Sequence, residues 1–556
     1  MTIKLYQLRD MDLVTKGKRI KIFFITLCFA SSIVFAEIKI ATIFSDGAVL
    51  QCEKPLPIWG WGKAGEEVKV SFAGQSQKTI VDAKGNWQLK LKAVKGSYKP
   101  YSMVVQSENS RIVIRNIVVG EVWFCSGQSN MMYTLEMLSL KTKDVGYESV
   151  LKFMKDEKEQ AKDEFLRQIK VPNVASALET KKDFEGQWLA STPQNNGSFS
   201  GTAYFFAKQL RQHLDRPVGI VNVTWGGKRI ESFIPPSEFN QAIHKQLLTK
   251  IQKQVKSYDA QLASKKYQQA MVKYREAIKL NRKKGLPRPK RPIMSVVPSA
   301  NSATPASIFN GMVNPVIPYA IRGAIWYQGE SHNPNRVEAH RGLLKSLIRG
   351  WRAKWQQGNF PVYFCQLANL GESLKEPLQK KNTWVEISNQ LRLGLEISNT
   401  GMAVLHDIGQ VKDIHPVNKV DVGKRLSRWA LHDTYQINNI VPSGPLFQSA
   451  ERKGATVIVH FNYSESGLIV GKKQLLEPVK PVERKLSGFE LCGEDGVWKY
   501  ATAKIINPNQ VLLSHKDIVK PRGVRYAWQQ NPANANLYNK AGLPTAIFST
   551  TKVSSK

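Results

Sequence analysis

Cysteine is scarce in this chain of 556 residues, which has only five, and no two of them form a CxxC pair. Structural zinc sites need closely spaced ligands, so the sequence implies no metal site. Four of the cysteines lie at wide spacing outside the N-terminal segment, and two of these are in apolar runs typical of buried strands. This placement favours buried free thiols over two disulfides for Cys52, Cys125, Cys365 and Cys492.

Acidic residues are also few, because 44 Asp and Glu stand against 80 Lys and Arg, for a formal net charge of +36. The basic residues are spread along the chain, without the aromatic-interleaved clusters of nucleic-acid-binding proteins. We therefore expect no nucleic-acid partner. Attraction to anionic glycans or to an anionic envelope fits the charge better, although a generally basic proteome would give the same excess.

An apolar run at residues 22–35 is too short to span a bilayer comfortably. It follows the basic stretch 18–21 and ends in Val34-Phe35-Ala36, with small residues where a signal peptidase cuts. We predict a signal peptide over residues 1–36, a periplasmic or secreted location, and no stable membrane insertion after cleavage. An uncleaved anchor is the alternative.

The chain of 556 residues has the composition of a folded protein, with 42% apolar and 22% charged residues. Its length favours one large catalytic domain with smaller modules. Residues 37–116 alternate short β-rich runs with turns, as in 68–72, 79–81 and 87–91. This spacing predicts an N-terminal β-sandwich domain.

From residue 117 to 434, apolar runs bounded by glycine alternate with helical stretches such as 203–214 and 340–355, which is typical of a parallel α/β sheet. Two stretches look like solvated helical insertions, 133–170 and the Lys- and Gln-rich 239–292. Residues 435–556 return to a β pattern and predict a C-terminal β-rich module. The expected strands of the sheet are 117–124, 218–223, 321–326, 361–366 and 402–405.

The segment Gly127-Gln128-Ser129-Asn130 follows the first expected strand of this sheet. Ligands gather at the carboxyl ends of the strands in open α/β sheets, so Ser129 is a candidate nucleophile. A serine in this position could equally cap the next helix. A second strand ends in Trp225-Gly226-Gly227, where backbone N–H groups could face an oxyanion, or where the glycines could simply form a turn.

A third strand brings Gln328 and Glu330 to the same edge. An amide side chain can complete an oxyanion hole, whereas Glu330 could also be structural. The loop Lys412-Asp413-Ile414-His415-Pro416 offers a base, because Pro416 favours extended geometry and Asp413 and His415 then share a side. Asp413 could orient His415, and His415 could take the proton of Ser129. His406 is a rival base, but packing in a strand explains it.

Taken together in this order, the motifs resemble those of the sialate O-acetylesterase family of carbohydrate esterases, within the SGNH hydrolases. The resemblance rests on Gly127 to Met131, Trp225-Gly226-Gly227, Phe309 to Met312, Trp326 to Ser331 and Asp413 to Lys419.

This resemblance implies a flavodoxin-like three-layer α/β hydrolase domain between flanking β-sandwich modules. It implies Ser129 as nucleophile and His415 as base. The amides of Ser129 and Gly227 and the Gln328 side chain would hold the oxyanion. Asp413 is two residues before His415, so Glu330 or a backbone carbonyl could share its orienting role. We also expect Glu330 and Asn130 at the oxyanion and substrate site.

The predicted reaction is two-step acyl transfer on an acetylated glycan, with no metal or cofactor. A xylan or other plant-polysaccharide acetyl esterase would use the same residues. A third reading is a glycan-binding protein whose central domain is inactive, although Ser129, Gln328 and His415 argue against it.

Overall fold

The computed structural model describes residues 14–15, 18–19, 37–141, 146–550 and 554–555. The chain forms two compact units, Met1–Glu37 and Ile38–Lys556. In the first unit the described residues are β1 (Val14–Thr15), β2 (Lys18–Arg19) and Glu37. The predicted signal peptide therefore lies almost wholly outside the described residues. Among the described helices, none has the length and apolarity needed to cross a membrane.

The second unit begins with short antiparallel strands of the kind that its turn-punctuated sequence predicts. Strand β5 pairs with β3 and β8, and β6 pairs with β7 and β9. Buried and exposed side chains alternate along β6, so one of its faces packs inward. The bounds are β3 (Lys39–Ile40), β4 (Val49–Gln51), β5 (Leu56–Trp61), β6 (Glu67–Phe72), β7 (Gln75–Ile80), β8 (Asn86–Leu91) and β9 (Ser97–Gln106).

Strand β10 (Arg111–Gly127) runs from this region into the central sheet. Its first part pairs antiparallel with β9, and residues 118–120 pair with β4. From Glu121 onward it pairs in parallel with β13 and β14. The predicted division between residues 116 and 117 falls inside this continuous strand.

The central sheet has the strand order β12-β11-β13-β10-β14-β15-β16. Its pairs are parallel except for β11 with β12. Strand β10 is in the middle, so the turn after it lies between the ends of β13 and β14. The bounds are β11 (Asp163–Lys170), β12 (Trp188–Ser191), β13 (Val218–Thr224), β14 (Gly323–Tyr327), β15 (Val362–Cys365) and β16 (Thr400–Ala403).

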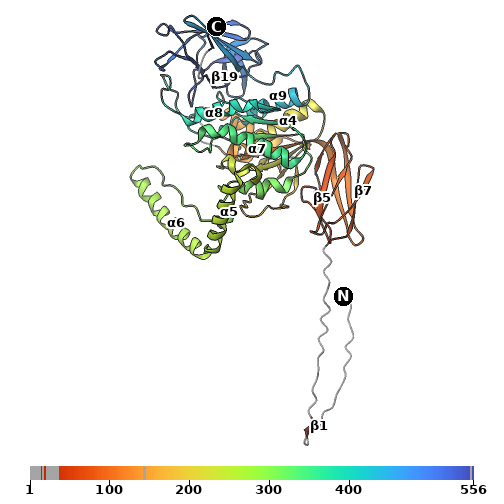
Figure 1. The fold of residues 1–556 in the computed structure, drawn as a ribbon. Helices are drawn as coiled ribbons and strands as arrows, with labels where there is room; N and C mark the ends of the chain where they lie inside the picture. The colour runs from red at the N-terminus through yellow and green to blue at the C-terminus, as the bar shows by residue number, and fades with distance from the viewer. Residues whose placement is uncertain (1–13, 16–17, 20–36, 142–145, 551–553, 556) are drawn as a thin grey trace. The chain divides into compact units, whose positions relative to one another are not determined.

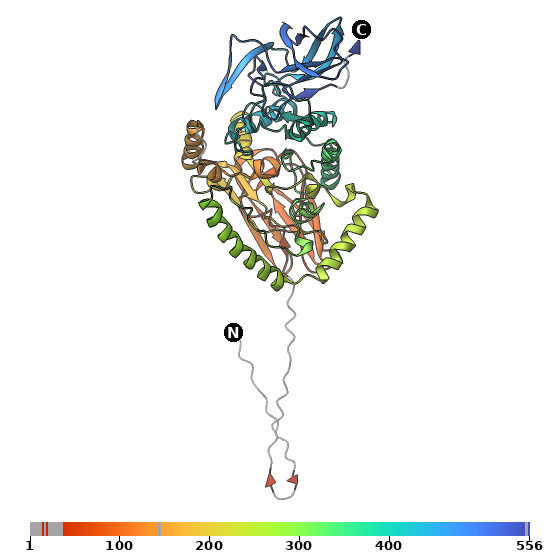
Figure 2. The same cartoon turned by 90° about the vertical axis from the view of Figure 1, so that its left-hand side faces the viewer.

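Aromatic contacts show which helices pack on each face of the sheet. Neighbouring residues of a strand point to opposite faces. In β10, Phe124 packs on Trp351 of α7, whereas Trp123 packs on Phe206 of α4. Helix α9 lies against α4 (Figures 1 and 2). The predicted mixed α/β class is thus confirmed. The bounds are α4 (Gly201–Leu214), α7 (His340–Trp355), α8 (Thr383–Leu393) and α9 (Lys419–Trp429).

The two predicted insertions differ in outcome. Residues 239–292 hold α5 (Gln241–Lys256) and α6 (Ala260–Lys283), as expected, and these helices project from the central sheet in Figure 1. Residues 133–170 begin with α2 (Leu135–Ser139) and α3 (Glu148–Gln160). The prediction for their end was wrong, because 163–170 is the strand β11, whose residues 166–169 are buried. The polar residues of this strand led to the wrong prediction. Arg167 is buried there and donates hydrogen bonds to backbone carbonyl oxygens.

The C-terminal region is β-rich, as the sequence predicts, and its strands form several sheets in which the pairs are antiparallel except for β17 with β28. A second group of buried apolar side chains lies within it and also includes Val385 of α8. The bounds are β17 (Leu446–Lys453), β18 (Thr456–Asn462), β19 (Leu468–Gln474), β20 (Glu477–Pro481), β21 (Phe489–Cys492), β22 (Trp498–Tyr500), β23 (Thr502–Asn507), β24 (Gln510–Ser514), β25 (Gly523–Tyr526), β26 (Leu537–Asn539), β27 (Phe548–Ser549) and β28 (Ser554–Ser555).

The buried carboxylate of Glu121 joins the first strands to the central sheet. It accepts hydrogen bonds from Arg322 and Arg216, and the Cys52 thiol donates to it at 3.1 Å. The spacing of Cys52, Glu53 and Glu121 could hold a metal ion, but the two guanidinium groups already neutralise this cluster. Cys52, Cys125, Cys365 and Cys492 are all buried and free, as expected.

Candidate active site

Ser129 lies where the central strand β10 ends. The strand closes at Gly127, and the short helix α1 (Ser129–Met132) begins two residues later. Gly127 has a φ of +142°, and a Cβ atom there would lie 2.2 Å from the carbonyl oxygen of Tyr327 in β14. Glycine alone permits this close approach of two backbones. The turn that brings Ser129 to the sheet edge therefore depends on residue 127.

His415 is the side chain that meets the Ser129 hydroxyl. Its Nε2 atom lies 2.9 Å from Ser129 Oγ, a hydrogen-bond distance at which an imidazole can take the proton. The ring of Tyr133 stacks on the imidazole with centroids 4.5 Å apart. Ser129 is 8% exposed and the His415 side chain 23% exposed, so the pair is more open on the histidine side.

Asp413 faces the other nitrogen of this imidazole. Its Oδ1 atom lies 3.2 Å from His415 Nδ1 and also accepts the His415 backbone N–H at 2.8 Å. Lys141 donates to Asp413 Oδ2 and to the carbonyl oxygen of His415. Desolvation raises the pKa of Asp413, but the bonds from Lys141 and His415 outweigh it and hold the pKa below its ordinary value. Asp413 is thus an ionised carboxylate in the position of an orienting acid.

The imidazole of His415 is tuned toward its neutral form. Burial lowers its pKa below the ordinary value for histidine. Asp413 opposes this shift, and the positive charges of Lys419 and Lys141 add to it. A neutral imidazole near pH 7 is the form that can act as a general base.

The loop after β13 brings Gly226 beside Ser129, and Gly227 follows it in the chain. A Cβ atom on Gly226 would lie 3.5 Å from the Cβ of Ser129. Gly227 has a φ of +67° and is exposed. Among the described residues, neither the Ser129 nor the Gly227 backbone N–H donates to a protein acceptor. An oxyanion site requires backbone donors that are not already used in this way.

Gln328 lies at the end of β14 and is fully buried. Its Nε2 atom donates to the carbonyl oxygens of Ser331 at 2.9 Å and Lys228 at 3.3 Å. The amide therefore ties together the loops that follow β13 and β14. An oxyanion at Gln328 Nε2 would have to exchange with one of these bonds.

Glu330 contacts Asn130, whereas Asp413 is the carboxylate that faces His415. Its Oε1 atom accepts a hydrogen bond from Asn130 Nδ2 at 2.5 Å. Desolvation raises the pKa of Glu330, and the bond from Asn130 and the charge of Lys419 only partly offset it. The same Asn130 amide donates to the carbonyl oxygen of Ile414 at 3.0 Å. Asn130, which follows the serine, therefore holds the loop that carries the histidine.

Lys419 completes this network from the first residue of α9. Its Nζ atom donates to Asn130 Oδ1 and to the carbonyl oxygen of Pro416, both at 2.7 Å. The side chain is fully buried, and burial lowers its pKa to about 7. The nearby charge of Lys141 lowers it further, and that of Glu330 raises it.

This chain is similar in sequence and in structure to known carbohydrate esterases. A carbohydrate acetylesterase from Xanthomonas citri of known structure is 30% identical, with a TM-score of 0.72, over 92% of this chain and 99% of that chain. The family described as "carbohydrate esterase, sialic acid-specific acetylesterase" matches residues 303–432. This chain belongs to the sialate O-acetylesterase family. It is a carboxylic-ester hydrolase.

Curated members of the sialate O-acetylesterase family match most of the chain. The rat protein is 25% identical over 89% of this chain and 90% of its own length, and the human protein is 23% identical over 89% and 88%. The family match at 303–432 includes Gln328, Glu330, Asp413, His415 and Lys419, whereas Ser129 and Gly227 precede it.

The sequence did not single out three residues that surround the pair in this sialate O-acetylesterase family member. Lys141 and Tyr133 lie in the stretch 133–170, which its charged residues predict to be a solvated insertion. No sequence pattern in that stretch indicates that these two residues reach the site. Lys419 lies inside the motif around His415, but burial of its ammonium group is a property of the fold. The rival base His406 is buried and bonds the carbonyl oxygen of Thr545, far along the chain.

Proposed function

We propose that this chain is an exported carbohydrate O-acetylesterase that hydrolyses acetyl esters on sugars, with Ser129 as nucleophile and His415 as base. The contact of 2.9 Å between Ser129 Oγ and His415 Nε2 carries the proposal. Asp413 on the far side of the imidazole supports it. The parallel sheet, with the serine at the end of its central strand, favours the flavodoxin-like fold of the SGNH hydrolases.

In the first step the neutral imidazole of His415 takes the Ser129 proton as Oγ attacks the acetyl carbonyl carbon. The N–H groups of Ser129 and Gly227 stabilise the negative charge that forms on the carbonyl oxygen. Asp413 stabilises the imidazolium. His415 then returns the proton to the sugar oxygen as the ester bond breaks, which leaves an acetyl group on Ser129.

In the second step water replaces the sugar. His415 takes a proton from this water, which attacks the acetyl carbonyl carbon while the same N–H groups hold the oxyanion. The bond to Ser129 Oγ breaks, His415 returns the proton to the serine, and acetate leaves. Each proton transfer in these two steps passes through the imidazole of His415.

Export is the part of the proposal that rests on sequence alone. The basic stretch 18–21 and the apolar run 22–35 have the order and lengths of a signal peptide. The names of the curated relatives favour a sialic acid as the sugar. Acetate release from O-acetylated sialic acid, compared with release from acetylated xylan, tests that assignment.

The test of the mechanism is hydrolysis of 4-nitrophenyl acetate by Ser129→Ala and His415→Ala. Each substitution removes a reacting group, so we expect kcat to fall by roughly 10³-fold or more. Ser198→Ala and His432→Ala, which change the same residue types away from the site, should keep wild-type rates. Near wild-type activity in either active-site variant would rule out the assignment.

A further inference from the structure

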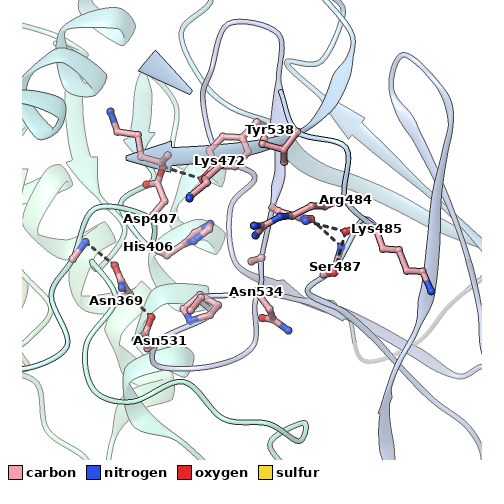
Figure 3. Close-up of a pocket in the computed structure, with 18 of the residues that line it drawn as sticks. Asn369, His406, Asp407, Lys472, Arg484, Lys485, Ser487, Asn531, Asn534 and Tyr538 are labelled. Carbon is pink, nitrogen blue, oxygen red and sulfur yellow. Dashed lines mark hydrogen bonds between the residues drawn. The ribbon is translucent and has the colours of Figure 1, made fainter. Parts of the chain in front are cut away.

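A polar cavity of about 560 Å³ lies where the 406–409 loop meets the C-terminal β-rich region. Figure 3 shows His406 and Asp407 on one side and Arg484, Lys485 and Asn534 across from them. None of the residues that we place in the Ser129 site lines it. The cavity therefore needs an explanation of its own.

The cavity carries unbalanced positive charge. Asp407, a carboxylate in its lining, is held by Arg425 through contacts of 2.6 and 2.9 Å. Lys473 pairs with Asp421 at 2.6 Å. In the described part of the chain, Lys472, Arg484 and Lys485 have no ion-pair partner. A cavity lined by these three cations and a neutralised carboxylate favours an anionic ligand.

The placement of Arg484 favours a carboxylate as the anion. In Figure 3 the Arg484 side chain extends across the cavity toward His406, whereas Lys485 points away from it. A guanidinium group offers paired N–H donors that match the two oxygens of a carboxylate.

Neutral polar groups and an aromatic ring line the rest of the cavity. Asn531 and Asn534 contribute amides, and Tyr538 contributes a ring. Asn531 is itself fixed, because it accepts from Asn369 Nδ2 at 2.9 Å and donates to the carbonyl oxygen of Gly371 at 2.7 Å. Amides suit the hydroxyl groups of a sugar, and an aromatic ring suits its apolar face.

The loop from Gly409 to His415 connects this cavity with the Ser129 site. Lys141 contacts Asp413 and His415, and six residues later Tyr147 lines the cavity and donates to the carbonyl oxygen of Gly409. Gly409 also lines the cavity, and the same loop continues to His415. The 409–415 loop thus reaches the Ser129 site at one end and the cavity at the other, and Lys141 and Tyr147 contact it near those two ends.

We propose that this cavity binds the carboxylate of an acidic sugar unit in the acetylated glycan, with Arg484 as its main ligand and Lys472 as a second cation. This inference rests on the proposed function, because it assigns an acidic glycan as the substrate of the proposed esterase. Sialic and uronic acids share this carboxylate chemistry.

The test is calorimetric titration of the full chain with N-acetylneuraminic acid and with glucuronic acid, each compared with its methyl ester. We expect at least one acid to bind. Its uncharged methyl ester should bind with an affinity lower by about tenfold or more. Arg484→Ala should weaken binding of the acid about tenfold. Lys520→Ala, the matched control, removes an exposed cation of the same β-rich region that does not line the cavity, and it should bind as the wild type does.

Equal affinity for acid and ester, unchanged binding in Arg484→Ala, or no binding of either acid would overturn the proposal. Tighter binding of a sulfated neutral sugar would also overturn it. In kinetics, Arg484→Ala should lower kcat/KM for an O-acetylated acidic glycan relative to that for 4-nitrophenyl acetate. The two hypotheses fail separately: retained hydrolysis in Ser129→Ala counts against the esterase mechanism, whereas the titrations decide the cavity.

Discussion

The Nζ atom of Lys419 lies 2.7 Å from Oδ1 of Asn130, in contact across 289 residues of sequence. Asn130 follows Ser129 directly, and Lys419 also holds the carbonyl oxygen of Pro416 beside His415. One buried ammonium group thus connects the segment of the nucleophile with the loop of the base. We expect the distance between Ser129 and His415 to depend on this connection.

Substituting Lys419→Met keeps the length of the side chain and removes its donors. The Asn130 oxygen and the Pro416 carbonyl then lose their partner, and we expect kcat for 4-nitrophenyl acetate to fall about 10- to 100-fold through misplacement of His415. Loss of the Lys419 charge, which lowers the pKa of His415, should also move the acid limb of the pH profile to higher pH.

The matched control is Lys424→Met, which changes an exposed lysine of the same helix. It should leave both kcat and the pH profile as in the wild type. A Lys419→Met protein with a lower melting temperature but an unmoved pH profile would show that the lysine is only structural.

The orienting acid can be identified by comparing Asp413→Asn with Glu330→Gln. Asp413 lies 3.2 Å from His415 Nδ1, whereas Glu330 bonds Asn130. We expect kcat to fall roughly 10²- to 10⁴-fold in Asp413→Asn, because the imidazolium loses its stabilising charge. Glu330→Gln should lose much less. The reverse order in steady-state rates would assign the role to Glu330.

The pH profile should follow the neutral form of His415. Burial, Lys419 and Lys141 lower its pKa, so kcat/KM should be constant above the ordinary histidine pKa of 6.5 and fall as pH drops through a lower value. Asp413 raises this pKa, so Asp413→Asn should shift the limb further down. Rates with 4-nitrophenyl acetate across pH 4 to 9 check both shifts, and a limb above 6.5 would contradict the first.

The elements that position the site could be predicted because their side-chain patterns are local. Helices α4 and α7 occupy the segments predicted at 203–214 and 340–355 almost to the residue. The strands that end at Gly127, Thr224 and Tyr327 follow from apolar runs closed by glycine or polar residues. Their shared edge follows from the rule for parallel sheets.

Contacts between distant segments could not be predicted. Strand β11 reads as polar because Arg167 is buried and satisfied by the carbonyl oxygens of Gly47 and Asn116, which the sequence does not place beside it. Lys141 is likewise one of many lysines until the fold sets it against Asp413. The use of the Gln328 donors by two loop carbonyls depends on loop geometry that no motif encodes.

The turn before Ser129 gives the last prediction, because Gly127→Ala should damage stability and activity together. A Cβ atom at residue 127 would lie 2.2 Å from the Tyr327 carbonyl oxygen, at a φ of +142°. Gly74→Ala is the matched control, since Gly74 also has positive φ, of +78°, but has nothing within 4 Å of its added Cβ.

Both variants carry backbone strain of about 1 to 3 kcal/mol, and the clash adds to it only at residue 127. Urea unfolding should therefore show a larger loss for Gly127→Ala, and hydrolysis of 4-nitrophenyl acetate should fall in that variant alone. Equal losses in the two variants would mean that β10 and β14 can separate without cost, and that the backbone contact does not set the position of Ser129.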